Sequence, residues 1–411
     1  MKGNIYVILS QIALFLLIVE LIYCFYKKRQ FFSQQEFIMN LGTAIINQFM
    51  NLAVLFIVIK SYGFLHDNYA LTKIELNWWT AGILLLSIDF LFYWFHRWGH
   101  SINILWAAHS PHHSAEEMNL AVGLRASVTQ RLFSFSMFWP LTLIGFRPED
   151  IYIFTGIHLI LGYWHHTRVI GKLGWFEKYF NTPSHHRVHH GTNEKYLDKN
   201  FAEIMIVWDK MFGTFQEELD EEPVCYGILR HPESWSPLKI NFHFYGMLWQ
   251  DCKETPRLWD KIRLWFMPLG WRPPGVSHRD PVKAYDLSEQ VKFKTRIIAN
   301  YLPYLYTNLL FSIGAMFFII NVKNGIGLSY RLPAIALVIL NIHFWSYVLE
   351  GDLSKKLEFF LSLALATFAA IGLQSGLESL KGMSVFFALW TLVRLAYTSF
   401  VSVEETGQVE A

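Results

Sequence analysis

Long apolar runs separated by shorter polar segments are the main pattern along the chain. A helix that crosses about 30 Å of hydrocarbon needs roughly 20 mostly apolar residues. Three runs near the start of the chain approach or exceed this length, at residues 5–26, 37–64 and 78–95. Four more lie towards its end, at residues 297–320, 332–349, 357–373 and 385–400. We expect each of these runs to form a membrane-spanning helix.

Two shorter apolar runs, at residues 132–146 and 151–164, are separated by a turn-like sequence at residues 146–150. Each is short for a full crossing, so the pair either spans the membrane or forms a re-entrant hairpin. The chain is therefore predicted to be an all-α, multi-pass membrane bundle with about seven to nine membrane segments.

Lysine and arginine in the loops predict the orientation, because cytoplasmic loops are enriched in them. The basic residues 27–29 directly follow the first run and place its end in the cytoplasm. Alternation of the spans then returns residues 96 and 166 to the same side. The basic pair at 355–356 agrees with this orientation, and two other basic residues oppose it. We expect an integral protein of a bacterial inner membrane or the endoplasmic reticulum.

Composition supports a membrane protein and excludes other classes. Of 411 residues, 53% are hydrophobic and 17% are charged, whereas a soluble chain is about a quarter charged. A formal net charge of +2 argues against a nucleic-acid partner. Three scattered cysteines exclude a disulfide framework and any CxxC motif. The unusual feature is histidine: 12 of the 17 lie between His96 and His190.

The first histidine motif is the HxxxH pair of His96 and His100. Side chains at i and i+4 share one helix face, so both imidazoles can reach one metal ion. The second motif, HxxHH at residues 109–113, contains Pro111, which predicts a turn or a helix start at most.

A second HxxHH set begins at His186, and the adjacent pair His165 and His166 follows a short apolar run. Only one of that pair is expected to face the site. Imidazole is a good ligand for iron, zinc and copper, and nine histidines suffice for two metal ions. The alternative is a set of core histidines without metal. Absence of an HExxH motif in the sequence weakens a zinc protease interpretation.

These motifs, at the predicted cytoplasmic ends of membrane helices, resemble the fatty acid hydroxylase/sterol desaturase superfamily of membrane di-metal oxygenases. Within it, the NTPSHHRVHHG sequence at residues 181–191 and the WDK and FGTF sequences at 208–215 resemble the alkylglycerol monooxygenase branch. The resemblance covers about residues 75–250. One position departs from the pattern: animal members carry an acidic residue directly after the second histidine of the first motif, and this chain has Ser101.

The resemblance implies a di-iron centre that uses O2 to hydroxylate a lipid. In the ether-cleaving branch, hydroxylation beside the ether oxygen yields a hemiacetal, which collapses to a fatty aldehyde and a glycerol derivative, with tetrahydrobiopterin as the electron source. The implied iron ligands are His96, His100, His109, His112, His113, His166, His186, His189 and His190. An alternative is another lipid or sterol hydroxylase or desaturase with a separate electron carrier. A metal transporter or buffer is the alternative of a different class.

Four further residues are candidates for a catalytic role. Asp89 lies seven residues before His96, inside an apolar run, where a carboxylate is costly unless it has a partner. We expect it to accept from a ligand imidazole or to line the site, or else to pair with a neighbouring helix. Glu116 is either a base beside the ligands or a helix N-terminal charge. Asn119 and Arg125 match the family pattern and either fix a polar head group or pterin or make structural hydrogen bonds.

The pattern and the resemblance together divide the chain into four parts. These are N-terminal anchor helices at 1–74, the hydroxylase-type catalytic domain at 75–250, a cytoplasmic connector at 251–296 and C-terminal membrane helices at 297–411. Several prolines between residues 167 and 296 argue against long uninterrupted helices there, and the acidic run at 217–222 is expected to be a solvated loop. Arg394, in the last apolar run, is expected to extend to the membrane surface.

Overall fold

Helices make up the regular secondary structure of the described chain, as the apolar pattern predicts. This computed structural model describes residues 5–276, 290–296, 301–321, 326–351, 354–375 and 377–405. Within them, the pairing of extended residues is limited to two isolated bridges. Seven helices of the described chain are long and apolar enough to cross a membrane. The prediction of an all-α, multi-pass bundle is therefore confirmed.

The chain divides into two compact units. The first comprises residues 1–37, 50–232 and 240–292, and the second comprises residues 38–49, 233–239 and 293–411. The helices up to residue 263 are α1 (Ile5–Tyr26), α2 (Gln34–Tyr69), α3 (Trp78–Gly99), α4 (Asn103–His113), α5 (Leu120–Leu124), α6 (Gln130–Ser136), α7 (Trp139–Ile144), α8 (Pro148–Tyr163), the 3-10 helix η1 (Gly174–Lys178), α9 (Pro183–His189), α10 (Val207–Phe212), α11 (Pro237–Glu254) and α12 (Leu258–Arg263).

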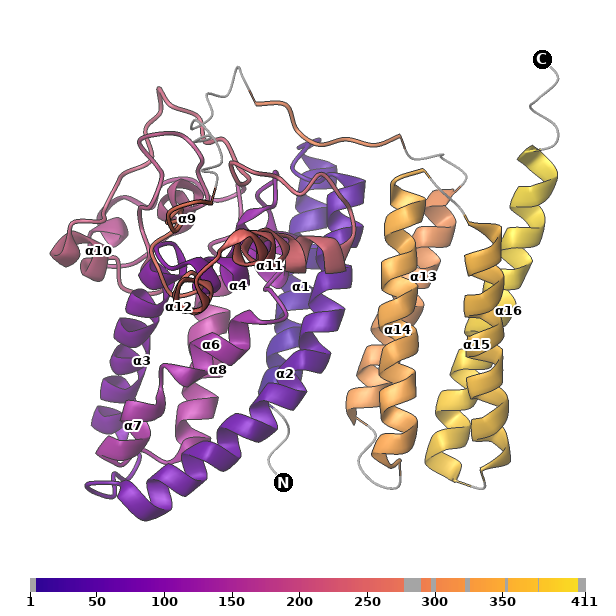
Figure 1. Cartoon of the computed structure of the whole chain (residues 1–411), viewed down its shortest axis with the longest axis horizontal. Helices are drawn as coiled ribbons and strands as arrows, with labels where there is room; N and C mark the ends of the chain where they lie inside the picture. Colours follow the sequence, from indigo (N-terminus) through magenta and orange to yellow (C-terminus); the bar gives the residue numbers. More distant parts are fainter. Residues whose placement is uncertain are drawn as a thin grey trace. The chain divides into compact units, whose positions relative to one another are not determined.

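Three helices of the first unit, α1, α3 and α8, lie side by side and position the histidines (Figure 1). Helix α3 begins at a capping box in which the Asn77 side chain accepts from the backbone of Thr80, and the Thr80 hydroxyl accepts from that of Asn77. Its inner face packs Phe92 and Phe95 against α6 and the turn before α7. Helix α3 also packs against α8, where the Phe92 ring lies 5.0 Å from the ring of His158.

The two shorter apolar runs form three helices in place of two spans. The run at 132–146 is divided between α6 and α7, and the run at 151–164 lies within α8, whose 16 residues span about 24 Å. Neither α6, α7 nor α8 is among the seven candidate spans. Helices α6 and α7 lead away from the histidines and α8 returns to them (Figure 1).

The polar segment contains one helix that the sequence interpretation missed. Helix α11 has 18 residues, so the expectation of no long helix there was wrong. Pro237 occupies its first turn, where a missing N–H costs nothing, and Pro256 lies beyond its end. The domain boundary expected at residue 250 falls inside this helix.

The acidic run at 217–222 is not simply solvated. Glu218 forms an ion pair with the buried guanidinium of Arg187 at 2.6 Å. Glu222 pairs with Lys195 at 2.7 Å. These pairs hold the loop against α9 and the segment that follows it.

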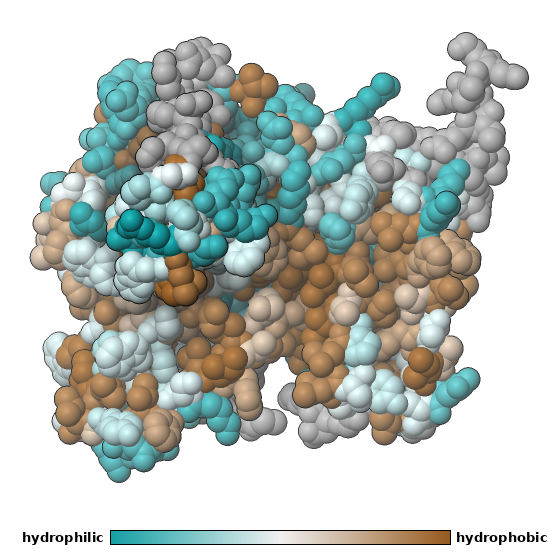
Figure 2. Space-filling view, viewed as in Figure 1, coloured by the Kyte–Doolittle hydropathy of each residue, from teal (hydrophilic) through white to brown (hydrophobic). Residues whose placement is uncertain are grey.

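The second unit is built on α13 (Leu302–Asn321), α14 (Leu328–Leu349), α15 (Lys355–Gln374) and α16 (Glu378–Glu405). These helices carry a broad hydrophobic band on their visible face (Figure 2). Residues 297–300, which the sequence interpretation assigned to the fourth span, lie outside the described residues. Arg394 does not extend to the surface: it is 1% exposed and forms an ion pair with Glu358 of α15, so that expectation was wrong.

Candidate metal centre

The HxxxH motif has the helical geometry that its spacing predicts. His96 lies in the last turn of α3 and His100 is its C-cap residue. Their ring centroids are 5.6 Å apart. Both side chains are buried, on the side of α3 that meets α4.

The second motif lies in a helix, so the expectation of a turn or helix start was wrong. Helix α4 includes Pro111 in its last turn and ends at His113. A proline there forfeits only one backbone hydrogen bond, to the carbonyl of residue 107. The first turn of α4 is completed by a distant segment: the carbonyls of Met267 and Trp265 accept from the N–H groups of Asn103 and Ile104.

The third motif lies on α9, which begins with Thr182 as N-cap and Pro183 in its first turn. His166 follows the end of α8. The structure brings all nine predicted ligands together in two groups. One consists of His96, His100, His109, His113 and His189, and the other of His112, His166, His186 and His190, with the possible ligand atoms of each group within 4.8 Å of one another.

The contacts inside the groups fit cations better than hydrogen bonds. The Nε2 atom of His113 lies 3.0 Å from that of His109, 3.1 Å from that of His189 and 3.2 Å from that of His100. A neutral imidazole nitrogen carries one hydrogen or one lone pair, so these contacts cannot all be hydrogen bonds. A cation among the converging lone pairs would satisfy all of them.

The outward-facing ring nitrogens support the same interpretation. The Nδ1 atom of His96 lies 2.7 Å from the carbonyl oxygen of Phe201, and that of His189 lies 2.9 Å from the carbonyl oxygen of Lys199. The Nδ1 atom of His166 lies 3.1 Å from the carbonyl oxygen of Tyr163. A carbonyl can only accept, so each Nδ1 carries the hydrogen and each Nε2 presents a lone pair to the group.

Burial favours the neutral form of several of these imidazoles. It lowers the pKa values of His109, His113 and His186 well below their ordinary range, with neighbouring histidines adding to the effect. Burial also lowers the pKa of His166 to about 4. Neutral imidazole is the form that binds metal.

For the metal-free protein we expect a fall in stability as the pH drops from about 6.5 towards 4. The unfolded chain protonates its histidines near pH 6.5, whereas the folded chain keeps them neutral. Each such histidine then costs about 1.4 kcal/mol per pH unit. Thermal unfolding of chelator-treated protein across this range measures the fall, and metal-loaded protein is the control, in which the decline should begin at lower pH. A flat profile for the metal-free protein would contradict the assignment.

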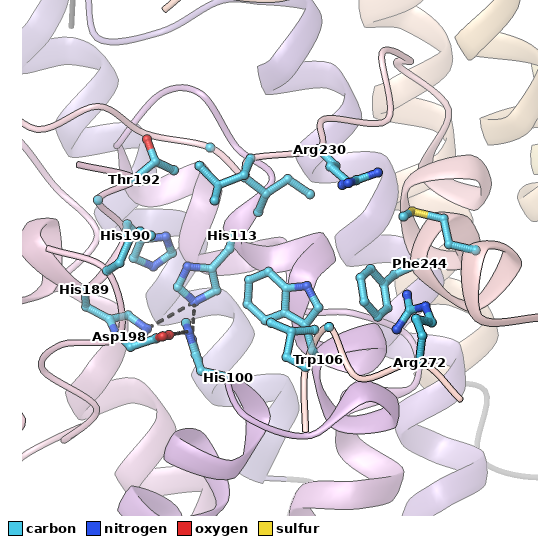
Figure 3. A pocket seen from close by; sticks show the side chains of 18 residues that line it. His100, Trp106, His113, His189, His190, Thr192, Asp198, Arg230, Phe244 and Arg272 are labelled. Carbon is cyan, nitrogen blue, oxygen red and sulfur yellow. Dashed lines mark hydrogen bonds and ion pairs between the residues drawn. The ribbon is translucent and has the colours of Figure 1, made fainter. Parts of the chain in front are cut away.

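A cavity of about 520 Å³ opens on one side of the histidines (Figure 3). His100, His113 and His189 form one wall, and Trp106 and Phe244 flank it. Further apolar side chains and the polar side chains of Thr192, Arg230 and Arg272 complete the lining. Asp198 lines the same cavity and lies 3.4 Å from Nδ1 of His100. A mostly apolar molecule with a polar group could therefore reach the histidines.

A smaller cavity of about 100 Å³ meets histidines of both groups, and sequence reasoning missed its carboxylate. Glu203 lines this cavity and is 7% exposed. Burial raises the pKa of Glu203 to about 7. Its Oε1 atom lies only 1.5 Å from where a Cβ on Gly162 would be. The glycine therefore makes room for the carboxyl group, and no local sequence pattern signals this pairing.

We expect Gly162→Ala to destabilise the protein by about 1–3 kcal/mol, because the new methyl group must displace the Glu203 carboxyl. Alanine otherwise stabilises a helix interior by up to about 1 kcal/mol, so a net loss identifies the clash. Thermal unfolding in detergent measures it. Gly171→Ala is the control, since nothing lies within 4 Å of that position. The double variant Gly162→Ala/Glu203→Ala should recover most of the loss, and a loss unchanged in it would point to another cause.

Asp89 lies away from the clustered imidazoles. Its carboxylate accepts from Nε2 of His158 at 2.8 Å and from the indole N–H of Trp208 at 2.9 Å. It also accepts from the backbone N–H groups of Ile204 and Met205, each at 3.0 Å. These bonds fix the segment whose Phe201 carbonyl orients His96. Asp89 therefore helps to position His96 through this segment, and a direct catalytic role stays a prediction.

The other three candidates also lie outside both histidine groups and both cavity linings. Asn119 caps α5 by accepting from Ala121, and its amide donates to the carbonyl of Phe31. Arg125 is buried and donates to the Ser114 hydroxyl at 2.5 Å.

Glu116 is 6% exposed, and its backbone N–H donates to Glu36 of α2. Glu36 also accepts from the next backbone N–H, and Glu20 of α1 accepts from that of Leu120. Buried carboxylates of the N-terminal helices therefore hold the loop that follows the second motif. The catalytic roles of the three candidates in this loop stay predictions.

The remaining histidines near the motifs lie outside the two groups, although the His165 ring is 5.8 Å from that of His186. His165 and His185 belong to neither group, and the His185 ring packs against Phe215 at 5.4 Å. His158 contacts Asp89. Of the more distant histidines, His278 lies outside the described residues.

Comparison with known proteins agrees with this site. A fatty acid hydroxylase family model matches residues 81–214. The alkylglycerol monooxygenase of Homo sapiens is 39% identical over 238 residues, which cover 57% of this chain and 52% of that protein. That of Danio rerio is 39% identical over 245 residues, covering 58% and 53%. That of Xenopus tropicalis is 36% identical over 261 residues, covering 63% and 57%.

The chain thus spans about half the length of the curated relatives that it matches. No solved structure is significantly similar to it. The family match includes all nine clustered histidines. Residues 81–214 therefore match the fatty acid hydroxylase family, in agreement with the resemblance inferred from the histidine motifs.

Proposed function

We propose that this protein is a membrane di-iron monooxygenase that cleaves alkylglycerol ether lipids. The observation that carries the proposal is the convergence of nine imidazoles in two groups beside a cavity with a mostly apolar surface. The similarity to alkylglycerol monooxygenases supports the ether substrate. We place the site on the cytoplasmic face of a bacterial inner membrane or the endoplasmic reticulum.

Two iron ions held by the nine histidines would supply the activation of O2, which no side chain can provide. The chain itself binds and orients the reactants. The cavity wall of Trp106 and Phe244 would hold the alkyl chain, and the histidine wall faces the carbon to be oxidised. Carbonyl oxygens of Lys199, Phe201 and Tyr163 hold the imidazole rings in place.

The overall reaction consumes the lipid, O2, two electrons and two protons. One oxygen atom enters the C–H bond beside the ether oxygen, and the other leaves as water. The resulting hemiacetal breaks its C–O bond to release a fatty aldehyde and a glycerol derivative. Tetrahydrobiopterin is the proposed electron donor, and a separate protein carrier is the alternative.

The test supplies purified, iron-loaded chain in lipid with an alkylglycerol, tetrahydrobiopterin and O2. We expect fatty aldehyde in proportion to pterin oxidised. Aldehyde formed only with a protein electron carrier would overturn the pterin assignment. No aldehyde from a fully iron-loaded chain with either donor would overturn the ether-lipid function. The same preparation, when offered other lipids, would then identify a different hydroxylase.

A further inference from the structure

Large apolar side chains are exposed on α12 and the residues beside it. Leu258, Trp259, Ile262 and Phe266 are 73%, 67%, 50% and 64% exposed, and Trp249 of α11 is 58% exposed. We call these five residues the apolar ledge. Dense exposure of large apolar side chains is uncommon on surfaces that face water and marks an interaction surface.

The apolar ledge is tied to the point where α3 ends. The backbone N–H of Leu269 donates to the carbonyl of Ser101, two residues beyond α3, at 2.8 Å. The side chain of Asn103 donates to the carbonyl of Leu264, also at 2.8 Å. Trp98, in the last turn of α3, is itself 38% exposed. The ledge therefore lies level with the end of a candidate membrane span.

The charges around the ledge fit the lipid head groups. Lys253 and Arg257 are exposed between Trp249 and Leu258, together with one acidic residue, Glu254. Asp260 is buried and pairs with Arg263 at 2.7 Å. Tryptophan next to lysine and arginine is typical of helices that lie in the membrane interface. Helix α11 lies across the direction of α1 and α3, as an interfacial helix does (Figure 1).

The segment that carries the ledge also forms part of the large cavity. Phe244 and Met247 of α11 and Leu269 beyond α12 line it. Cys252 of α11 contacts the carbonyl of Lys261 at 3.8 Å, which joins the two helices. One side of the segment thus closes the cavity beside the histidines, and the other side carries the ledge.

We propose that the apolar ledge is embedded in the head-group region of the bilayer that α1 and α3 cross, and that the lipid substrate enters the large cavity from the membrane beside it. The entry route rests on the proposed function, whereas the embedding of the ledge does not. The occupant of the ledge is therefore lipid, and a second copy of the chain is the competing occupant.

The first test measures lipid contact without any activity. The full chain with Ile262→Cys, labelled with an environment-sensitive fluorophore, is placed in vesicles containing lipids brominated high on the acyl chain. We expect quenching similar to that of a label on Phe25→Cys, exposed at the end of α1. It should be at least about 3-fold greater than on Asp220→Cys, in the acidic run. The labelled wild type, whose three cysteines are buried, gives the background.

Quenching at position 262 no greater than at position 220 would overturn the embedding. Energy transfer between labels at position 262 on different copies, unchanged when the protein is diluted in lipid, would assign the ledge to a dimer and also overturn it.

The second test addresses entry. The variant Trp259→Ser/Ile262→Ser/Phe266→Ser should raise KM for an alkylglycerol presented in vesicles by about 3-fold or more, with kcat, metal content and turnover of a short, detergent-dispersed substrate unchanged. An unchanged KM in vesicles would overturn membrane entry. Absence of activity in the wild type would instead refute the proposed function and leave the quenching result standing.

Discussion

Replacement of His186 by alanine is expected to remove about one of two bound metal ions and to lower activity by about 100-fold or more, whereas replacement of its neighbour His185 should leave metal content unchanged. The Nε2 atom of His186 lies 2.9 Å from that of His166 and 3.2 Å from that of His190. Its loss would leave three imidazoles in that group. His185 belongs to neither group.

The adjacent positions make a matched pair, because both residues lie on α9 and both are buried. Metal analysis of the two purified variants, together with their unfolding temperatures, separates loss of a ligand from loss of fold. His165→Ala and His166→Ala repeat the comparison at a second site. Full metal content in His186→Ala, or equal losses in both members of a pair, would contradict the two-group assignment.

The sequence could predict eight of the nine clustered histidines because short-range spacing controls their placement, and His166 was added by the family resemblance. HxxxH and HxxHH put imidazoles on one helix face wherever those helices lie. The membrane spans then bring the helix ends together, and the apolar pattern of the sequence predicts the spans as well. The sequence could not predict which group each histidine joins. His113 belongs to one group and its neighbour His112 to the other, because adjacent residues point towards different partners.

Contacts between distant segments account for what the sequence could not predict. Pro111 argued locally against a helix, but the first turn of α4 is completed by carbonyls more than 150 residues later. Glu203 meets Gly162 only through the packing of α8. For Asp89 the sequence left open a contact with the ligands or a pairing with a neighbouring helix, and its partners are His158 of α8 and the segment around Ile204. In each case the deciding neighbour lies outside any sequence window.

Arg394 shows the same limit with a larger energetic consequence. A lone arginine in an apolar run favours extension to the surface, but this guanidinium meets a carboxylate 36 residues earlier, on α15. It also donates to Asn308 at 3.0 Å, and Glu358 accepts from the Tyr304 hydroxyl at 2.6 Å. Both members of the ion pair, Arg394 and Glu358, thus make further hydrogen bonds, and the pair joins helices of the second unit.

Arg394→Met is therefore expected to destabilise the protein by about 3–5 kcal/mol, because it leaves the Glu358 carboxylate buried without its cation. The double variant Arg394→Met/Glu358→Leu should be more stable than the single variant, since an uncharged pair carries no uncompensated charge. Lys381→Met is the matched control: it removes an exposed ion pair with Glu378, worth about 0–1 kcal/mol. Unfolding in lipid-detergent mixtures at constant metal loading measures all three. If Arg394→Met unfolded like Lys381→Met, the buried pair would have no part in holding the helices together. If the double variant were no more stable than Arg394→Met, the loss would come from the contact of Arg394 with Asn308.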